Sequence, residues 1–282
     1  MIRYYNCKDI DPNKIYEAFS VGFSDYIVKM EISKEDFFKL FFGPEGNDIK
    51  YSFIALDEDK PIGLILGGIK DYEGLKTIRC GALCVHPDYR GKGISHELFK
   101  LHKEAGINNN CKQMFLEVIG ENHRAINFYE NKGYEKVYEL KYYTCKSLEK
   151  IGYKTNNGIT INEIGMDNIL DLGIRNVHIN WQNDFDYMKK YGDVKYYGAY
   201  GNHKLIGAIS INMNGRILLI WVDEEYRHRG IGKGLLSKAI KDLKLDRMSI
   251  AFPNNASLHG FVKKMDFQKE KLFQYEMYLT LD

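Results

Sequence analysis

The sequence contains few cysteines, and their arrangement excludes two kinds of site. Its five cysteines, Cys7, Cys80, Cys84, Cys111 and Cys145, include no CxxC pair. An odd number of cysteines without a repeated spacing argues against a disulfide framework and against a structural zinc site. We therefore expect no metal ion and a reducing compartment.

Long hydrophobic runs and an excess of one charge are also missing. The longest apolar stretches, near residues 62–69 and 217–222, are too short to cross a bilayer, and the N-terminal residues do not resemble a signal peptide. The 40 basic and 38 acidic side chains leave a formal charge of +2, without a long run of either sign. This balance indicates neither nucleic acid nor a membrane as a partner. We expect a cytoplasmic protein.

The sequence contains an internal repeat. Two segments read Tyr-Arg-x-x-Gly-Ile after an apolar run and an acidic residue, and their arginines, Arg90 and Arg227, lie 137 residues apart. Further along the chain, Asn122 and Asn255 open two similar segments and lie 133 residues apart. A tandem duplication explains both spacings. We therefore predict two domains of one fold, residues 1–150 and the shorter 151–282, with a polar, turn-rich boundary at 147–158.

Hydrophobic periodicity predicts the same order of elements in both halves. Residues 77–85 are apolar nearly throughout and are typical of a central strand, and residues 114–119 and 248–252 predict the strand that follows the next helix. Gly106 is expected to end the helix of the first half. A meander followed by strand, loop, helix, strand and helix is an α/β layout.

Between the central strand and the helix, both halves carry a loop with glycines and positive charge. The first loop contains Arg90, Gly91, Lys92, Gly93, Ile94 and Ser95, and the second contains Arg227, Arg229, Gly230 and Gly232. Such a turn presents unpaired N–H groups at the positive end of a helix dipole, which suits a phosphate. Glycines also serve a tight turn that binds nothing, but the repetition favours an anion site. The spacing matches neither a P-loop nor a dinucleotide fingerprint.

These loops resemble a known family. Arg90-x-x-Gly93-x-Ser95 and Arg227-x-x-Gly230-x-Gly232 are similar to the Arg/Gln-x-x-Gly-x-Gly/Ala loop of the GNAT superfamily of N-acetyltransferases, with a small departure at Ser95. Residues 116–134 look like the second signature of that family. The resemblance implies tandem GNAT-like acyl-CoA N-acyltransferase domains, each a mixed central sheet flanked by helices.

The same resemblance implies acetyl-CoA as the acyl donor. Its pyrophosphate would lie on the loop and its pantetheine along the preceding strand, at Leu83, Cys84 and Val85. A main-chain N–H of these residues would bind the oxyanion. Cys84 lacks an evident histidine partner, so we expect it to pack rather than carry an acyl group. Asn122 is expected either to cap the following helix or to contact the coenzyme, and the two roles are compatible.

Two side chains in the first half are candidates for proton transfer. Tyr129 follows Asn122 by seven residues, where the family has a tyrosine beside the coenzyme sulfur, and Glu117 precedes Tyr129 by twelve, as in ribosomal-protein alanine acetyltransferases. The resemblance implies that Tyr129 is the acid and Glu117 the base. Tyr129 also fits an amphipathic helix position, and Glu117 a solvent-facing strand position, without any catalytic role.

The second half lacks both candidates. Ile250 stands where the first half has Glu117, and Val262 stands where it has Tyr129. We predict that the first half is catalytic and that the second either binds coenzyme weakly or only packs. An active second half that recruits its acid and base elsewhere remains open.

The activity that follows is N-acetylation of a primary amine by direct attack in a ternary complex. The acceptor, a small-molecule amine or a peptide N-terminus, is expected to meet residues 19–42, which mix aromatic side chains with the acids Asp25, Glu31, Glu35 and Asp36. If two of these acids face the cleft, they favour a cationic amine. The alternatives are a non-catalytic protein that binds or senses acyl-CoA, and a transferase of another acyl group. The acceptor identity, acyl-chain preference and oligomeric state stay open.

Overall fold

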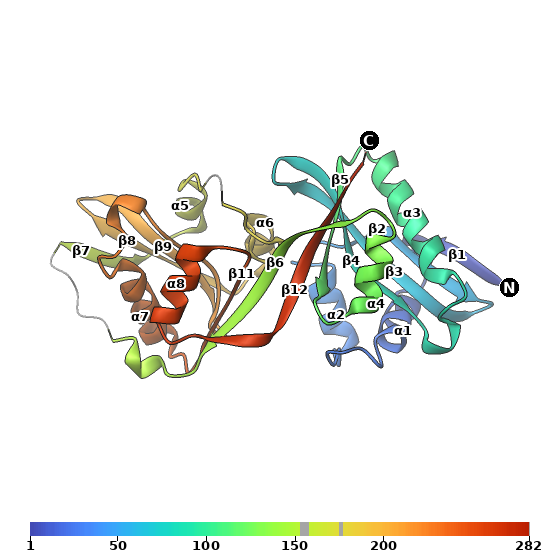
Figure 1. Cartoon of the computed structure of the whole chain (residues 1–282), viewed down its shortest axis with the longest axis horizontal. Coiled ribbons are helices and arrows are strands. Elements are labelled where there is room, and N and C mark those ends of the chain that lie inside the picture. The colour runs from blue at the N-terminus through green and yellow to red at the C-terminus, as the bar shows by residue number, and fades with distance from the viewer. Residues whose placement is uncertain (153–157, 175–176, 282) are drawn as a thin grey trace. The chain divides into compact units, whose positions relative to one another are not determined.

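The computed structural model describes residues 1–152, 158–174 and 177–281, and the chain forms two compact units. The first unit comprises Met1–Tyr138 together with Gln274–Asp282, and the second comprises Glu139–Phe273. Each unit has a mixed sheet with helices against it, which confirms the predicted α/β class (Figure 1). Among the described residues, no helix has the length and apolar character needed to span a membrane.

The division of the chain into domains at residue 150 stays a prediction. Residues 153–157, in the middle of the expected boundary, lie outside the described residues. The compact units follow contacts in space rather than order along the chain, so the last residues of the chain belong to the first unit.

The sheet of the first unit has the strand order β1–β2–β3–β4–β5–β12. Its strands are β1 (Ile2–Asn6), β2 (Asp48–Asp57), β3 (Lys60–Tyr72), β4 (Leu75–Val85), β5 (Gln113–Ile119) and β12 (Gln268–Thr280), of which β12 contributes its residues from Gln274 onward. Its helices are α1 (Pro12–Gly22), α2 (Lys34–Phe41), α3 (Ile94–Asn108) and α4 (His123–Glu130). The strands expected around residues 77–85 and 114–119 are confirmed.

Alternation along the strands assigns these helices to two faces. On β2, Ile54 and Leu56 belong to the core cluster of α1 and α2, whereas Ala55 belongs to the cluster of α3 and α4. On β3, Leu64 and Ile65 divide in the same way. Successive side chains of a strand point to opposite faces, so the sheet separates an α1/α2 layer from an α3/α4 layer.

β4 and β5 are the parallel pair of this sheet, and their pairing stops before either strand ends. Their register runs from Thr77↔Gln113 to Cys80↔Leu116, while β4 continues to Val85 and β5 to Ile119. We call the place where the two strands separate the fork. Because main-chain groups beyond the fork no longer face a neighbouring strand of this pair, they are available to a ligand.

The strand beside β5 comes from the other end of the chain. Gln274–Thr280 of β12 pairs antiparallel with β5, and Figure 1 shows the red β12 along it. The strand that follows α4 in sequence, β6 (Glu135–Cys145), pairs instead with β11 (Met248–Phe252) in the second unit. Nothing in the hydrophobic periodicity predicts this exchange.

The second unit repeats the pattern with the strand order β6–β11–β10–β9–β8–β7. Its other strands are β7 (Ile159–Glu163), β8 (Val194–Gly201), β9 (Lys204–Asn212) and β10 (Arg216–Val222). Its helices are α5 (Met166–Leu170), α6 (Phe185–Tyr191), α7 (Ile231–Leu243) and α8 (Ala256–Lys264). The predicted strand at 248–252 is confirmed.

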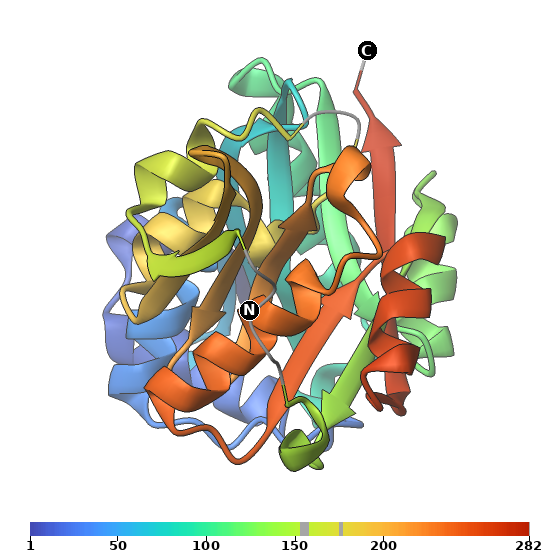
Figure 2. The ribbon, with the colours of Figure 1, turned by 90° about the vertical axis from the view of Figure 1, so that its left-hand side faces the viewer.

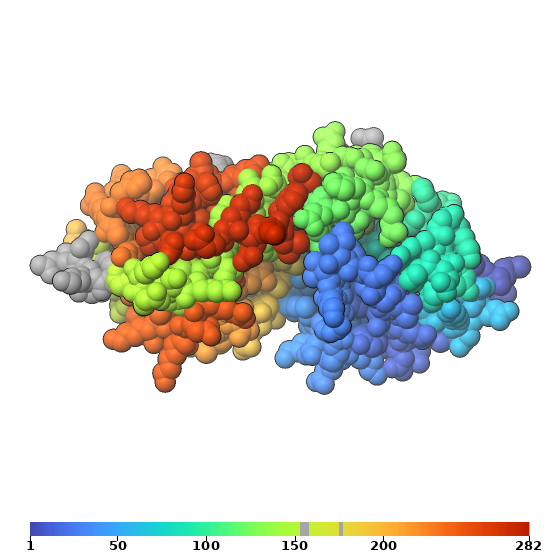
Figure 3. Space-filling model, turned by 60° about the horizontal axis from the view of Figure 1, so that its bottom comes forward, coloured from blue at the N-terminus to red at the C-terminus, as the bar shows by residue number. Residues whose placement is uncertain are grey.

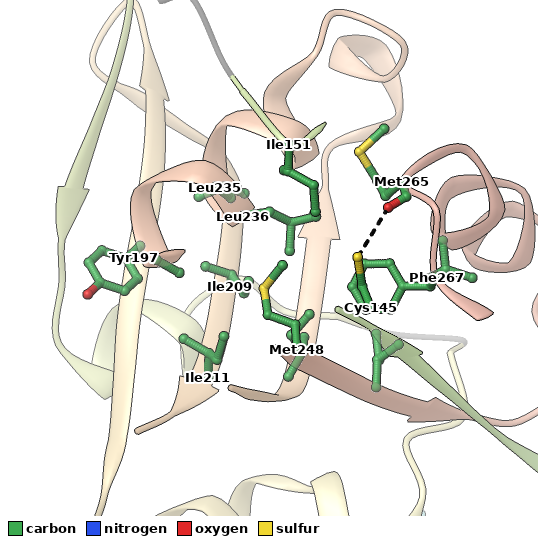
Figure 4. Packing of buried hydrophobic residues seen from close by; sticks show 14 of the residues in the cluster. Cys145, Ile151, Tyr197, Ile209, Ile211, Leu235, Leu236, Met248, Met265 and Phe267 are labelled. Carbon is green, nitrogen blue, oxygen red and sulfur yellow. Dashed lines mark hydrogen bonds between the residues drawn. The ribbon is translucent and has the colours of Figure 1, made fainter. Parts of the chain in front are cut away.

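One core cluster holds α7 and α8 against the second sheet, on the side seen in Figure 2. Leu235 and Leu236 of α7 pack with Met248 and Ile209 of the strands, as Figure 4 shows. In the same cluster, the Cys145 thiol donates to the carbonyl oxygen of Met265 over 3.7 Å.

The expectation that Gly106 ends the helix of the first half is wrong. α3 continues to Asn108, and Gly106 lies buried within it. A Cβ at this position would lie 2.8 Å from Cγ2 of Ile78, so the glycine allows α3 to approach β4 closely. The glycine serves packing rather than chain reversal.

The fold predicts that β12 stabilises the first unit. Met277 is fully buried in the α3/α4 core, whereas Met213 is 50% exposed in the second unit. We expect Met277→Ala to lower the free energy of unfolding by about 2–5 kcal/mol because it leaves a cavity. Met213→Ala is the matched control and should change little. Urea unfolding followed by circular dichroism measures both, and equal effects of the two variants would contradict the placement of β12.

Candidate active site

The glycine loops of the two units have nearly the same backbone. Gly93 and Gly230 are the N-cap residues of α3 and α7, with φ of 81° and 83°. Two residues earlier, Gly91 and His228 are also left-handed, with φ of 76° and 64°. These conformations leave the first N–H groups of each helix directed out of the loop. Both loops therefore have the backbone geometry that an anion-binding turn requires, and anion binding itself stays a prediction.

The arginine that opens each loop is anchored in the same way. Nε of Arg90 donates to the carbonyl oxygen of Val85, and Nε of Arg227 donates to that of Val222, both over 3.2 Å. The likeness of the copies therefore extends to side-chain contacts, as a duplication predicts.

In the first unit, Arg90 also holds the segment that follows α1. Its guanidinium donates to both carboxylate oxygens of Asp25, over 2.5 and 2.6 Å, and to the carbonyl oxygen of Gly22 over 3.3 Å. The hydrogen bonds from Arg90 lower the pKa of Asp25, so this carboxylate is ionised at neutral pH. Arg90 thus links the glycine loop to the α1–α2 segment, which forms part of the blue surface in Figure 3.

The positions predicted to hold pantetheine lie on β4 beyond the fork. Leu83, Cys84 and Val85 pair with β3 on one side. Cys84 is buried, with its sulfur 3.5 Å from the carbonyl oxygen of Ala18, and burial raises the pKa of its thiol to about 12. Cys84 is therefore a protonated packing residue, as the sequence led us to expect.

Glu117 lies on β5 directly after the fork, inside the protein. Its side chain is 3% exposed, so the alternative of a solvent-facing glutamate is wrong. Nη2 of Arg79 donates to Oε2 of Glu117 over 2.6 Å, and Nη1 of Arg79 donates to Oε2 of Glu45 over 2.6 Å. Burial raises the pKa of Glu117 to about 7, with Glu45 and Glu276 adding to the rise and Arg79 opposing it.

Tyr129 reaches the same place from the α3/α4 layer. Its hydroxyl lies 3.8 Å from the sulfur of Cys80, the last residue of β4 that pairs with β5. Burial raises the pKa of Tyr129 well above its usual value, so the hydroxyl keeps its proton at neutral pH. Because Arg79 and Cys80 are neighbours on one strand, Glu117 and Tyr129 approach the fork from opposite faces of the sheet.

Both asparagines are helix caps. The side-chain oxygen of Asn122 accepts from the N–H of Ala125 over 3.2 Å, and that of Asn255 accepts from the N–H of Leu258 over 2.9 Å. The capping role of Asn122 is confirmed, and its contact with coenzyme stays a prediction.

The acids expected to meet the acceptor have local partners or are exposed. Asp25 pairs with Arg90, Glu31 lies 3.4 Å from Lys29, and Asp36 accepts from the hydroxyl of Ser33. Several aromatic residues of this segment, Phe19, Phe37 and Phe41, form the α1/α2 core. The buried acidic side chains linked to Arg79 or paired with β5 are instead Glu45, Glu117 and Glu276.

Arg79 was not among the predicted site residues, although the duplication carries a signal for it. Arg79 precedes Arg90 by eleven residues, and Arg216 precedes Arg227 by eleven. Arg79 stands inside an otherwise apolar strand and Arg216 at the start of the corresponding one, and a charged residue repeated beside apolar strand positions marks a polar site.

In the second unit the fork is present without these acids. Ile217 of β10 is the last residue paired with β11, opposite Ile250. Ile250 and Val262, at the positions of Glu117 and Tyr129, are buried in the hydrophobic core. Neither side chain can transfer a proton.

Comparisons with known proteins agree with this arrangement. A model of the acetyltransferase (GNAT) family matches residues 13–134 and 172–267. N-alpha-acetyltransferase 30 of Schizosaccharomyces pombe is 31% identical over 106 residues, which make up 37% of this chain and 70% of that protein.

Solved structures share the fold over both units. A tandem GNAT protein from the clavulanic acid biosynthesis pathway has a TM-score of 0.73 at 13% identity, with 99% of this chain and 98% of that chain covered. A GCN5-related N-acetyltransferase from Sphaerobacter thermophilus has a TM-score of 0.71 at 12% identity, covering 99% and 95%. The predicted tandem fold is confirmed, and the finer resemblance of the first half to ribosomal-protein alanine acetyltransferases stays a prediction.

The environment of Glu117 predicts how stability changes with pH. The pKa of this carboxyl in the folded chain is about 7, above its usual 4.5, so between these values the folded chain holds a proton that the unfolded chain releases. The contribution of Glu117 to stability is therefore full below pH 4.5 and is lost as the pH rises through 7. We expect the free energy of unfolding of wild type, relative to Glu117→Gln, to fall from pH 5 to 8.

The measurement is urea unfolding at several pH values in that range. Glu135→Gln, at an exposed position, is the matched control and should follow wild type at every pH. Curves of wild type and Glu117→Gln that stay parallel would show that Glu117 titrates normally.

Proposed function

Because this chain belongs to the GNAT acetyltransferase family, we propose that its first unit transfers an acetyl group from acetyl-CoA to an amine. The observation that carries this proposal is the meeting of a buried carboxyl and a buried phenol at the fork of β4 and β5. Glu117 and Tyr129 supply these two groups, and the second unit has Ile250 and Val262 in their places.

The glycine loop of the first unit is suited to the coenzyme pyrophosphate. A Cβ added at Gly91 or Gly93 would meet none of the described atoms within 4 Å, so the loop backbone is open to a ligand. Lys92 lies over the ring of Tyr89 at 4.5 Å and adds positive charge beside the loop. The N–H groups of Ile94 and Ser95 begin α3 and complete the anion site.

Beyond the loop, the free edge of β4 would hold the pantetheine arm. Main-chain groups of Leu83, Cys84 and Val85 lie past the last pair of the fork, so a hydrogen-bonding arm can replace the missing strand there. An N–H on this edge would donate to the carbonyl oxygen of the thioester as it becomes an oxyanion.

Transfer then proceeds by direct attack of the amine on the thioester carbon. Glu117 takes the proton that the amine loses, directly or through water, as the new C–N bond forms. The C–S bond breaks, and Tyr129 gives its proton to the departing thiolate. A base with a pKa of about 7 and a phenol that keeps its proton at neutral pH suit these two roles.

The acceptor in this proposal is a primary amine, either a small molecule or a peptide N-terminus. The name of the Schizosaccharomyces pombe relative, an N-alpha-acetyltransferase, supports the peptide N-terminus. The carboxyl groups of Glu45, Glu117 and Glu276 outnumber the Arg79 guanidinium near the fork, which favours a cationic amine.

Binding of acetyl-CoA tests the division of labour between the units. We expect Gly93→Asp to weaken binding at least about tenfold and to abolish turnover, because the new carboxylate repels phosphate at the helix N-terminus and its side chain strains a left-handed position. Gly230→Asp should leave turnover intact. Calorimetric titration and a thiol-release assay over a panel of amines and peptides measure both properties.

Gly74→Asp is the matched control, because Gly74 has a φ of 81° with open space around it, in the turn between β3 and β4. If Gly230→Asp alone abolishes binding and turnover, the catalytic unit is the second. Tight binding without turnover of any amine would favour the alternative of a protein that senses acyl-CoA.

The proton-transfer roles predict a loss of kcat without a loss of coenzyme affinity. We expect Tyr129→Phe and Glu117→Gln each to lower kcat by about 10²-fold or more, because each removes a group that moves a proton. Tyr134→Phe is the matched control for Tyr129→Phe, since it removes a neighbouring buried hydroxyl. Steady-state kinetics measure kcat, and equal rates of Tyr129→Phe and Tyr134→Phe would remove Tyr129 from the mechanism.

A further inference from the structure

The first unit contains another fully buried carboxyl that the proposed mechanism does not use. Glu276, on β12, has no exposed surface and stands directly opposite Glu117 in the antiparallel register of β12 and β5. Residues directly opposite in such a pair point to the same face, with Cβ atoms about 4.5–5.5 Å apart. The pair Phe115↔Tyr278 confirms the shared face, since the two rings lie 5.0 Å apart.

The groups around Glu117 come from four elements. Arg79 lies on β4, Glu45 follows α2, Glu276 lies on β12 and Tyr72 lies on β3. Arg79 is the cation among them, and its guanidinium hydrogen-bonds to both Glu45 and Glu117. Two like charges that share a buried site oppose ionisation of one another.

The cation and the carboxyls beside Glu117 have opposite effects on its pKa. The ion pair with Arg79 fixes the carboxyl in place and favours its ionised form, which makes it a weaker base. The carboxyls of Glu45 and Glu276 both oppose that form and so strengthen the base, and Glu276 does so from the position directly opposite Glu117. A buried pair of Arg79 with Glu117 alone would hold a carboxylate that accepts protons poorly near neutral pH.

We propose that Glu276 is a positioning residue for acyl transfer, which acts by its charge to keep Glu117 able to accept the amine proton, while Arg79 and Glu45 hold Glu117 at the fork. This inference rests on the proposed function, in which Glu117 is the base. β12 follows α8 of the second unit in sequence, so a strand from the end of the second half contributes a residue to the proposed site of the first unit.

The test is the pH dependence of kcat/KM for Glu276→Gln. Removal of the carboxylate charge lowers the pKa of Glu117, so the acidic limb of the profile should move to lower pH by about one unit. The KM for acetyl-CoA should not change, since Glu276 lies on β12 opposite β5 and is not part of the glycine loop. Glu270→Gln, an exposed carboxyl of the same strand, is the matched control and should keep the wild-type profile.

Glu276→Asp gives a second measurement if Glu276→Gln does not fold. It keeps the charge but withdraws it by one methylene, so the acidic limb should move in the same direction by a smaller amount.

The outcomes separate this inference from the proposed function. If Glu117→Gln keeps full turnover, the base is another group and the proposed function fails at that point. If Glu117→Gln is inactive and the limb of Glu276→Gln, or of Glu276→Asp where that is the variant that folds, coincides with wild type or moves to higher pH, the inference alone is wrong. A lower rate without a shift of the limb would show that Glu276 is merely structural.

Discussion

The first unit depends, for both its fold and its proposed chemistry, on the buried ion pairs that Arg79 forms with Glu45 and Glu117. These pairs join β4, β5 and the segment after α2 over hydrogen bonds of 2.6 Å. Charges taken out of water are tolerated only when they are paired, and loss of one partner from such a network costs about 3–5 kcal/mol. The ion pair that keeps Glu117 beside the fork therefore also stabilises the folded chain.

The exchange of β6 and β12 gives the duplication a role beyond repetition. β12 pairs with β5 in the sheet of the first unit, and β6 pairs with β11 in that of the second. The first unit therefore takes a strand that follows the whole of the second unit in sequence, whereas the second unit takes the strand that directly follows α4. β12 supplies Met277 to the core of the first unit and Glu276 to the surroundings of the proposed base, so both depend on this strand.

Local features of this fold follow from the sequence, and non-local ones do not. The loop at Gly93 and the cap at Asn122 depend on residues a few positions apart, so spacing predicts them. The partners of Arg79 lie 34 and 38 residues away, and β12 lies far along the chain from β5, so no local pattern reveals them. Gly106 shows the same limit, because a glycine that permits close packing looks like one that ends a helix.

The two units show which parts of the design are set by backbone and which by side chains. Arg216, the counterpart of Arg79, donates to the carbonyl oxygen of Gln182 and to Oδ1 of Asn183, both over 3.0 Å, where Arg79 has carboxylates. The glycine loop, the separation of the parallel strands and the capping asparagine are all present in the second unit as well as in the first. The two units differ at the position of the proposed base, which is Glu117 in the first unit and Ile250 in the second. A scaffold common to both units, with the carboxyl and the phenol in the first unit alone, supports the proposal that the first unit is the catalytic one.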